Sequence, residues 1–266
     1  PIEPGSETDR LPRERGWTHW HHLFNPRQLL MAGFLAEYGA KLDEVEAVAA
    51  LLALGKAVNW NSRLSGWISD AANEKGRDTF YNQALNPLVT YVCRGSAALE
   101  TTVCARINSS PVPVSAAVKP MDARTVDWPA DIWITDPGYA DAINYEELSE
   151  FFLAWYEKRL PQLFPGWYTD SKRALAVRGR DEDFRRAMVE CYKRFAELMP
   201  PNGFQIVMFT HQDAEVWSDL ALILWAAGLQ VTAAWTVATE TVSAGIRQGN
   251  YVQGTVLLIL RKRADN

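Results

Sequence analysis

The order of apolar runs and amphipathic stretches from residue 121 onward constrains the fold most. It predicts strand, helix, helix, strand, helix, strand, loop and strand, with strands near 131–135, 204–209, 230–237 and 252–260. Strands that alternate with helices are typical of a parallel, doubly wound α/β sheet with helices on both faces. The final two strands have no helix between them, so we expect an antiparallel hairpin at one edge.

Helical spacing supports one of these helices, and a capping pattern supports another. Phe184, Met188, Cys191, Phe195 and Leu198 fall on one predicted inner face of a helix that starts at Asp181. Asn144 is a candidate N-cap for the helix that begins there, with Glu147 three residues later as the reciprocal capping partner.

The N-terminal part of the chain predicts helices. Asn25 followed by Pro26 is a good helix start, and Gly39 is the expected stop. A further helix is expected over 78–95. The predicted organisation has three parts: an extended or disordered lead-in over 1–15, a helical region over 16–100 and an α/β domain over 101–266.

Charge and cysteine usage narrow the class of protein. A net charge of −5 excludes a generally basic nucleic-acid coat, so any nucleic-acid contact is expected to be a local patch. The three cysteines form no CxxC pair, which favours a reduced, cytoplasmic protein without a structural zinc site. The chain has no apolar run near the roughly 18 residues that span a membrane and no signal peptide, so we expect no membrane partner.

The predicted strand 131–135 ends abruptly at Asp136-Pro137-Gly138-Tyr139. By itself this is also the pattern of an ordinary Pro-Gly turn. An acid, a proline and an aromatic residue directly after a strand are, however, typical of a site at the carboxyl edge of an open α/β sheet, where ligands bind.

These four residues resemble the Asp-Pro-Pro-Tyr signature of amino-methylating DNA methyltransferases, with Gly138 in place of the second proline. Other short stretches agree in order: Phe24-Asn25-Pro26-Arg27-Gln28-Leu29, Phe209-Thr210-His211, and Trp235-Thr236 followed by Glu240. Together, over about residues 16–263, they are similar to the large prokaryotic adenine-specific DNA methylases that carry an uncharacterised N-terminal domain.

The resemblance implies a Rossmann-like, S-adenosylmethionine-dependent methyltransferase fold that acts on DNA, at adenine N6 in preference to cytosine N4. The family's glycine-rich cofactor loop has no match in this chain. We therefore expect a C-terminal portion or a split subunit, with an upstream polypeptide supplying that loop. The alternative is a non-catalytic DNA-binding or assembly subunit that retains the methylase fold. A nucleotide-dependent enzyme finds no support, since the chain has no GxGxxG and no phosphate loop.

In this family the target base is flipped out of the duplex. The resemblance implies that Asp136 and the Pro137 carbonyl accept the hydrogens of the exocyclic amine, while Tyr139 stacks on the base. Gly138 makes this loop freer, at a cost of about 1 kcal/mol in ordering.

The remaining predicted site residues are less specific. For the cofactor, the resemblance implies Phe24-Asn25-Pro26 at the methionine end and Asp122 at the adenine amine. For the substrate, the candidates are Asn144, Trp167, Tyr168, Arg173, Arg178 and His211. Each of these also has an ordinary interpretation: Asn144 as a helix cap, His211 as a polar strand end and the others as a solvated loop.

Overall fold

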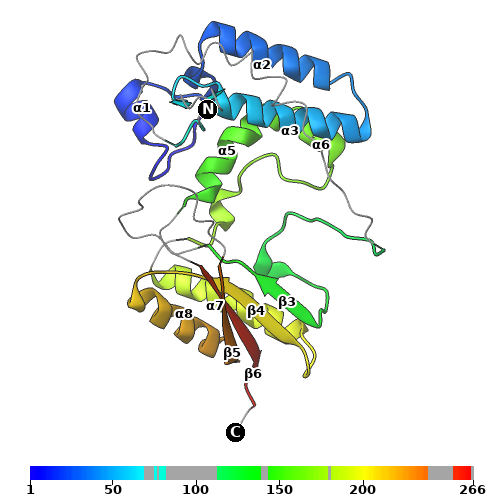
Figure 1. The fold of residues 1–266 in the computed structure, drawn as a ribbon, viewed down its shortest axis with the longest axis vertical. Coiled ribbons are helices and arrows are strands. Elements are labelled where there is room, and N and C mark those ends of the chain that lie inside the picture. The colour runs from blue at the N-terminus through cyan, green and yellow to red at the C-terminus, as the bar shows by residue number, and fades with distance from the viewer. Residues whose placement is uncertain are drawn as a thin grey trace. The chain divides into compact units, whose positions relative to one another are not determined.

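The chain divides into two compact units, each with its own apolar core. The computed structural model describes residues 1–68, 75–76, 78–81, 113–138, 143–178, 181–238 and 254–264. We call Pro1–Pro120 with Tyr145–Arg173 the helical unit, and Met121–Asn144 with Ala174–Asn266 the sheet unit. Figure 1 shows the elements of both units.

The helical unit is built from short and medium helices around a cluster of aromatic residues. Its elements are α1 (Arg10–Arg15), η1 (Trp20–Leu23), α2 (Pro26–Gly39), α3 (Glu44–Trp60), the paired strands β1 (Trp67–Ile68) and β2 (Lys75–Gly76), α5 (Tyr145–Tyr156) and α6 (Leu160–Leu163). Phe151 of α5 is fully buried at the centre, where Trp20, Phe24 and Phe80 surround it.

The first fifteen residues differ from the predicted extended or disordered lead-in. They contain α1, and Leu11 is buried. The Glu147 carboxylate accepts hydrogen bonds from Thr8 N at 2.8 Å, from Glu7 N at 3.0 Å and from Ser6 Oγ at 3.1 Å. Because the anchoring group lies about 140 residues away in the chain, local composition does not reveal this order.

The boundary between the units also differs from the predicted division at residue 100. Helices α5 and α6 belong to the helical unit, although they follow the first strand of the sheet in the chain. The reason is the apolar face of α5, whose Phe151 and Trp155 pack with Phe24. That face completes the helical core instead of covering the sheet.

The sheet unit contains a four-stranded mixed sheet. Its elements are η3 (Ala123–Thr125), β3 (Ile132–Thr135), α7 (Glu182–Leu198), β4 (Phe204–Phe209), α8 (Ala214–Ala226), β5 (Leu229–Val237) and β6 (Thr255–Lys262); η4 (Arg173–Leu175) lies at the unit boundary. The strand order is β3-β4-β6-β5. β3 runs parallel to β4, whereas β6 runs antiparallel to both β4 and β5.

The predicted β5–β6 hairpin is confirmed, and β4 lies in the interior of the sheet between β3 and β6. The hairpin does not simply extend the edge, because β6 inserts between β4 and β5. Among the strands that the structure describes, one pair in this sheet is parallel and two are antiparallel, so the sheet is mixed rather than mostly parallel. Three of the four strands nevertheless point the same way, since β4 and β5 are both antiparallel to β6.

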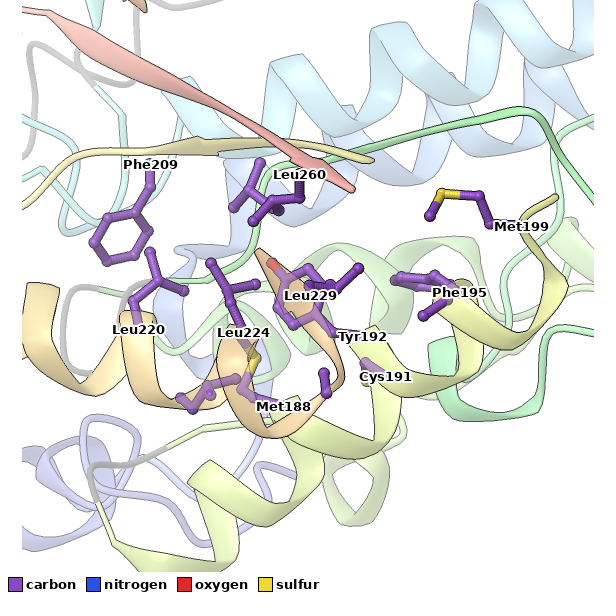
Figure 2. Close-up of a cluster of buried hydrophobic side chains, with 14 of the residues drawn as sticks. Met188, Cys191, Tyr192, Phe195, Met199, Phe209, Leu220, Leu224, Leu229 and Leu260 are labelled. Atoms are coloured by element: carbon purple, nitrogen blue, oxygen red, sulfur yellow. The ribbon is translucent and has the colours of Figure 1, made fainter. Parts of the chain in front are cut away.

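Helices α7 and α8 pack on one face of the sheet and form the core of this unit (Figure 2). The predicted inner face of α7 is confirmed: Phe184, Met188, Cys191 and Phe195 are buried, and Leu198 packs against them. They meet side chains of β4 and β6, among them Phe209 and Leu260. Burial raises the pKa of the Cys191 thiol to about 11, so this cysteine is a core residue and not a thiolate nucleophile.

In the described residues of the sheet unit, the opposite face of the sheet carries exposed apolar side chains. Ile134 is 65% exposed and Trp235 is 66% exposed. In register, Ile134 pairs with Ile206, which pairs with Ile259, so an apolar row crosses three strands. We expected helices on both faces of the sheet. The two long helices described in the sheet unit, α7 and α8, share one core cluster and therefore lie on the same face.

Several predictions lie outside the described residues. They concern Tyr139, Glu240 and all of the expected helix 78–95 beyond Tyr81. In the parts of the chain that the structure describes, no helix is long and apolar enough to cross a membrane.

Candidate functional site at the carboxyl edge of the sheet

The ends of β3 and β4 meet at one edge of the sheet. The strands are parallel and in register from Ile132 opposite Phe204 to Thr135 opposite Val207. Asp136 follows β3 and His211 follows β4, so the topology brings both to the carboxyl edge, where α/β proteins bind ligands. The Asp136 side chain is exposed there and is available to a ligand.

Tyr192 of α7 lies beneath the end of β3. Its hydroxyl is 3.4 Å from Thr135 Oγ1, and the residue is 2% exposed. Burial raises the pKa of Tyr192 to about 12, and the negative charge of nearby Asp136 adds to this rise. The phenol therefore stays protonated and holds the end of β3 by a neutral hydrogen bond.

Gly138 has room for a side chain. Among the described residues, no heavy atom lies within 4 Å of a Cβ placed on Gly138. Its φ is outside the left-handed region that favours glycine. Neither sterics nor backbone conformation thus requires glycine at this position.

His211 organises the turn between β4 and α8. Its Nδ1 accepts a hydrogen bond from Asp213 N at 3.0 Å, and its carbonyl accepts one from Trp217 Nε1 at 2.8 Å. His211 therefore has a structural role here, and its predicted role in lining a substrate site stays a prediction.

Asp122 is held by an ion pair within its own loop. Oδ1 accepts from Arg124 N and Arg124 Nε, each at 2.9 Å, and Oδ2 accepts from Arg124 Nη2 at 2.8 Å. The hydrogen bond from the Arg124 side chain is the main reason that the pKa of Asp122 lies below its ordinary value. A cofactor amine would have to compete with these donors for both carboxylate oxygens.

The other predicted cofactor residues serve the helical unit. Phe24 is 5% exposed, and its ring lies 6.1 Å from Phe151 and 5.1 Å from Trp155. Asn25 forms a capping box with Gln28: Asn25 Oδ1 accepts from Gln28 N, and Asn25 N donates to Gln28 Oε1, both at 2.9 Å. Pro26 opens α2. The prediction of a helix start at Asn25-Pro26 is confirmed.

The predicted substrate residues of the 166–180 loop fall on both sides of the unit boundary. In the helical unit, Trp167 stacks on Phe164 at 4.4 Å, and Lys172 lies over the Tyr168 ring at 5.1 Å. Arg173 is largely buried and forms ion pairs with Glu150 and Glu3. These acidic partners already compensate its charge, so a phosphate would have to displace them.

Arg178 and Asn144 lie in segments of the sheet unit next to this boundary. Of the predicted site residues, the carboxyl edge of the sheet thus brings together Asp136, Pro137, Gly138 and His211.

A cavity of about 240 Å³ lies beside this edge, between the N-terminal halves of α7 and α8. Gly138 forms part of its wall. The apolar lining consists of Phe184, Met188, Phe209, Val216, Leu220 and Ile223, and the charged lining of Arg185, Asp213, Glu215 and Asp219. Phe184 and Met188 belong to the predicted inner face of α7, and helical spacing carries no signal that a space is left beside such side chains.

A larger cavity, about 490 Å³, lies in the helical unit between α2, α3, α5 and α6, and none of the predicted site residues lines it. In the described parts of the chain, no three His, Cys, Asp or Glu side chains group so as to hold a metal ion. The fold and the edge site thus define a mixed α/β protein with an exposed acidic side chain at the carboxyl end of a parallel strand pair. Neither a scan against protein-family models nor searches of curated proteins and of solved structures give a match.

Proposed function

We propose that this chain supplies the base-holding edge of an S-adenosylmethionine-dependent DNA amino-methyltransferase that acts on adenine N6 in preference to cytosine N4. The observation that carries the proposal is the position of Asp136: it is exposed and directly follows β3, beside the parallel strand β4. The β5–β6 hairpin after the crossover helix α8 adds support, because such an ending resembles the second half of an S-adenosylmethionine-dependent methyltransferase.

The proposed chemistry of this chain is the activation of an exocyclic amine by hydrogen-bond acceptors that are held in position beside it. The lone pair of an exocyclic amine on a nucleobase is delocalised into the ring, which makes the nitrogen a poor nucleophile. The Asp136 carboxylate and the Pro137 carbonyl would accept its two hydrogens and favour a more tetrahedral nitrogen. Such preorganised acceptors contribute through geometry and electrostatics.

The residues predicted to hold the cofactor do not fit it in their present contacts. Phe24 is packed in the helical core, Asn25 caps α2, and both oxygens of Asp122 bind Arg124. We therefore assign only the base-holding residues to this chain. The methyl group would come from a cofactor bound by a separate polypeptide.

Two features of the sheet unit support such a polypeptide partner. Among the described strands β3 pairs with β4 alone, and no described strand occupies its second edge. The face that carries Ile134 and Trp235 is apolar and exposed. Open edges and large apolar patches are typical of interaction surfaces.

The second candidate is a non-catalytic DNA-binding or assembly subunit. The internal engagement of Asn25, Asp122 and Arg173 favours it, since three predicted ligand-binding side chains have structural partners instead. Gly138 favours it too, because it departs from the signature where neither sterics nor backbone conformation requires glycine.

The substitution Asp136→Ala tests the first candidate. The chain is produced with the product of its upstream coding sequence, and methyl transfer to DNA and DNA binding are both measured. We expect methyl transfer to fall by at least about 100-fold, as for loss of one preorganised group, while DNA binding is retained. Asp127→Ala is the matched control, because Asp127 is an exposed aspartate of the same unit.

Equal loss of transfer and binding in Asp136→Ala would indicate a structural role. If the wild-type chain and its upstream partner bind DNA without any methyl transfer, the assembly-subunit candidate is favoured. A gain of activity in Gly138→Pro would indicate that the signature has decayed at this position.

A further inference from the structure

We propose that the cavity of the helical unit, between α2, α3, α5 and α6, binds a small amphipathic monocarboxylate, whose apolar body fills the cavity while its carboxylate binds Arg159. The volume of about 490 Å³ lies within the range of roughly 300–1,000 Å³ that holds drug-sized ligands. The cavity follows the second half of α2, since its first lining residue, Gly33, lies about two helical turns beyond Asn25. No residue of the proposed methyltransferase function lines it, so this inference stands apart from that function.

Small side chains leave this space between the helices. The lining includes two glycines and five alanines: Gly33, Ala36, Gly39, Ala40, Ala47, Ala50 and Ala154. At Gly39 the helices α2 and α3 are close, because a Cβ placed there would lie 3.0 Å from Ala50 Cβ. The larger apolar members of the wall include Leu51 and Leu54, which are 9% and 2% exposed. Such a wall favours an apolar ligand body, because apolar surface of both is removed from water.

Arg159 supplies a positive charge that the described residues do not neutralise. Its Nη1 donates to Gln162 Oε1 at 2.7 Å and its Nη2 to the Leu42 carbonyl at 2.6 Å, and both acceptors are uncharged amide oxygens. In the described parts of the chain, no carboxylate forms an ion pair with this half-buried guanidinium. An anionic ligand would therefore gain charge-assisted hydrogen bonds here without displacing an acidic partner.

Two buried N–H groups of the cavity wall also lack acceptors. Arg159 Nε and Trp155 Nε1 are buried and have no hydrogen-bond partner among the described residues, and both side chains line the cavity. A buried donor without an acceptor costs free energy, so an acceptor that reaches it stabilises the complex. A carboxylate has two oxygens in one plane, which match the N–H groups along one side of a guanidinium. A small rotation of either side chain would bring its free N–H to such a ligand.

The remaining charges of the lining favour a single negative charge on the ligand. Glu37 is already paired with Lys41 at 3.1 Å, while Glu157 and Lys158 are exposed neighbours of opposite charge. With Arg159 the lining holds two carboxylates and two cations. A monocarboxylate matches the one guanidinium without an acidic partner, whereas a doubly charged phosphate would meet uncompensated repulsion from the carboxylates.

Calorimetry with matched probes tests the proposal on the full chain, without DNA or cofactor. Decanoate, 1-decanol and decyl phosphate share one apolar chain and differ in the head group, and each is used below its micelle-forming concentration. We expect decanoate to bind, and 1-decanol to bind at least about tenfold more weakly because it lacks the charge. Decyl phosphate should bind more weakly than decanoate.

Two variants locate the binding. Arg159→Gln removes the charge and should weaken decanoate binding at least about tenfold. Its control is Arg10→Gln, because Arg10 is an exposed arginine of the same unit outside the lining. Ala154→Leu narrows the cavity from an exposed position and should also weaken binding, whereas Ala49→Leu, at an exposed alanine of α3 outside the lining, should not. Ala154→Leu keeps the test valid if Arg159→Gln fails to fold.

A second readout is thermal unfolding. A ligand held between four helices stabilises the folded helical unit by mass action, so decanoate should raise the Tm of the wild type and not that of Arg159→Gln. The proposal is overturned if decanoate does not bind, if 1-decanol binds equally well, or if both Arg159→Gln and Ala154→Leu bind like the wild type. Tighter binding of decyl phosphate than of decanoate would overturn the assignment to a monocarboxylate.

Discussion

Glu147 shows how one carboxylate can hold a chain terminus. It is 3% exposed and accepts hydrogen bonds from Ser6, Glu7 and Thr8. Burial by itself raises the pKa of Glu147, but the hydrogen bonds from Thr8, Glu7 and Ser6 outweigh it and bring the pKa below its ordinary value. The ionised form is therefore the one that stabilises the folded helical unit.

A pH dependence of stability follows from this pKa. A carboxyl group whose pKa is lower in the folded state contributes stability above its unfolded pKa, about 4.3 for Glu, and loses it as the pH falls through the folded value. We expect the free energy of unfolding of the helical unit to decrease below about pH 4.3. In Glu147→Gln this contribution should be lost at neutral pH, and its pH dependence should be reduced.

Chemical denaturation at several pH values measures this effect. Glu46→Gln is the control, since Glu46 is an exposed residue of α3 in the same unit. A Glu147→Gln variant as stable as the wild type at neutral pH would show that the neutral amide anchors residues 6–8 equally well.

The sequence correctly predicted that Asp136 follows a strand, but it did not predict the partners of several other side chains. Asp136 could be placed because a strand that ends at a polar residue is a local signal. The structural roles of Asp122 and Arg173 could not be predicted from such a local signal. Asp122 pairs with Arg124 two residues later, whereas Arg173 pairs with Glu150 in another helix, and residue type alone does not distinguish an internal ion pair from a ligand contact.

Among the elements, α2 has the most completely defined start. Its capping box satisfies two backbone groups reciprocally, and Pro26 occupies the first turn. The sequence was sufficient to predict this start, because the capping signal is contained in four consecutive residues.

Loss of this cap should destabilise the helical unit measurably. We expect Asn25→Ala to lower its free energy of unfolding by about 1 kcal/mol, since the Gln28 N–H loses its acceptor. Asn25→Asp, which keeps a capping oxygen, should lose much less. Urea denaturation measures both variants, and an Asn25→Ala protein as stable as the wild type would contradict this role of the cap.

The strands were predicted to within a few residues, but their order in the sheet was only partly predictable. Hydrophobic runs show where β4, β5 and β6 lie, and the missing helix between β5 and β6 indicates a hairpin. No local sequence pattern predicts that β6 lies next to β4. That pairing depends on contacts between residues such as Ile206 and Ile259, which are far apart in the chain.

For the whole molecule, the two cores are the main units of stability. Leu224 is 2% exposed in the core of the sheet unit, and Leu64 is 1% exposed in that of the helical unit. The sequence could not predict this division, because α5 lies between β3 and β4 in the chain and yet belongs to the helical core.

We expect each core to respond separately to a cavity-forming substitution. Leu224→Ala should cost about 2–5 kcal/mol and reduce amide hydrogen-exchange protection in the sheet unit, with little change in the helical unit. Leu64→Ala should give the reverse pattern. Exchange measured by mass spectrometry reports both units in one experiment, and equal loss of protection throughout the chain in either variant would show a single cooperative unit.

The interleaving of the two units has a consequence for synthesis on the ribosome. The chain emerges from the N-terminus, so Tyr145–Arg173, the last part of the helical unit, is made before β4. The helical unit can then fold before β4, the partner strand of β3, has been synthesised. During that interval Ile132 and Ile134 belong to an unpaired apolar strand on the nascent chain. A chaperone that shields short apolar strands would act on this protein between translation of β3 and translation of β4.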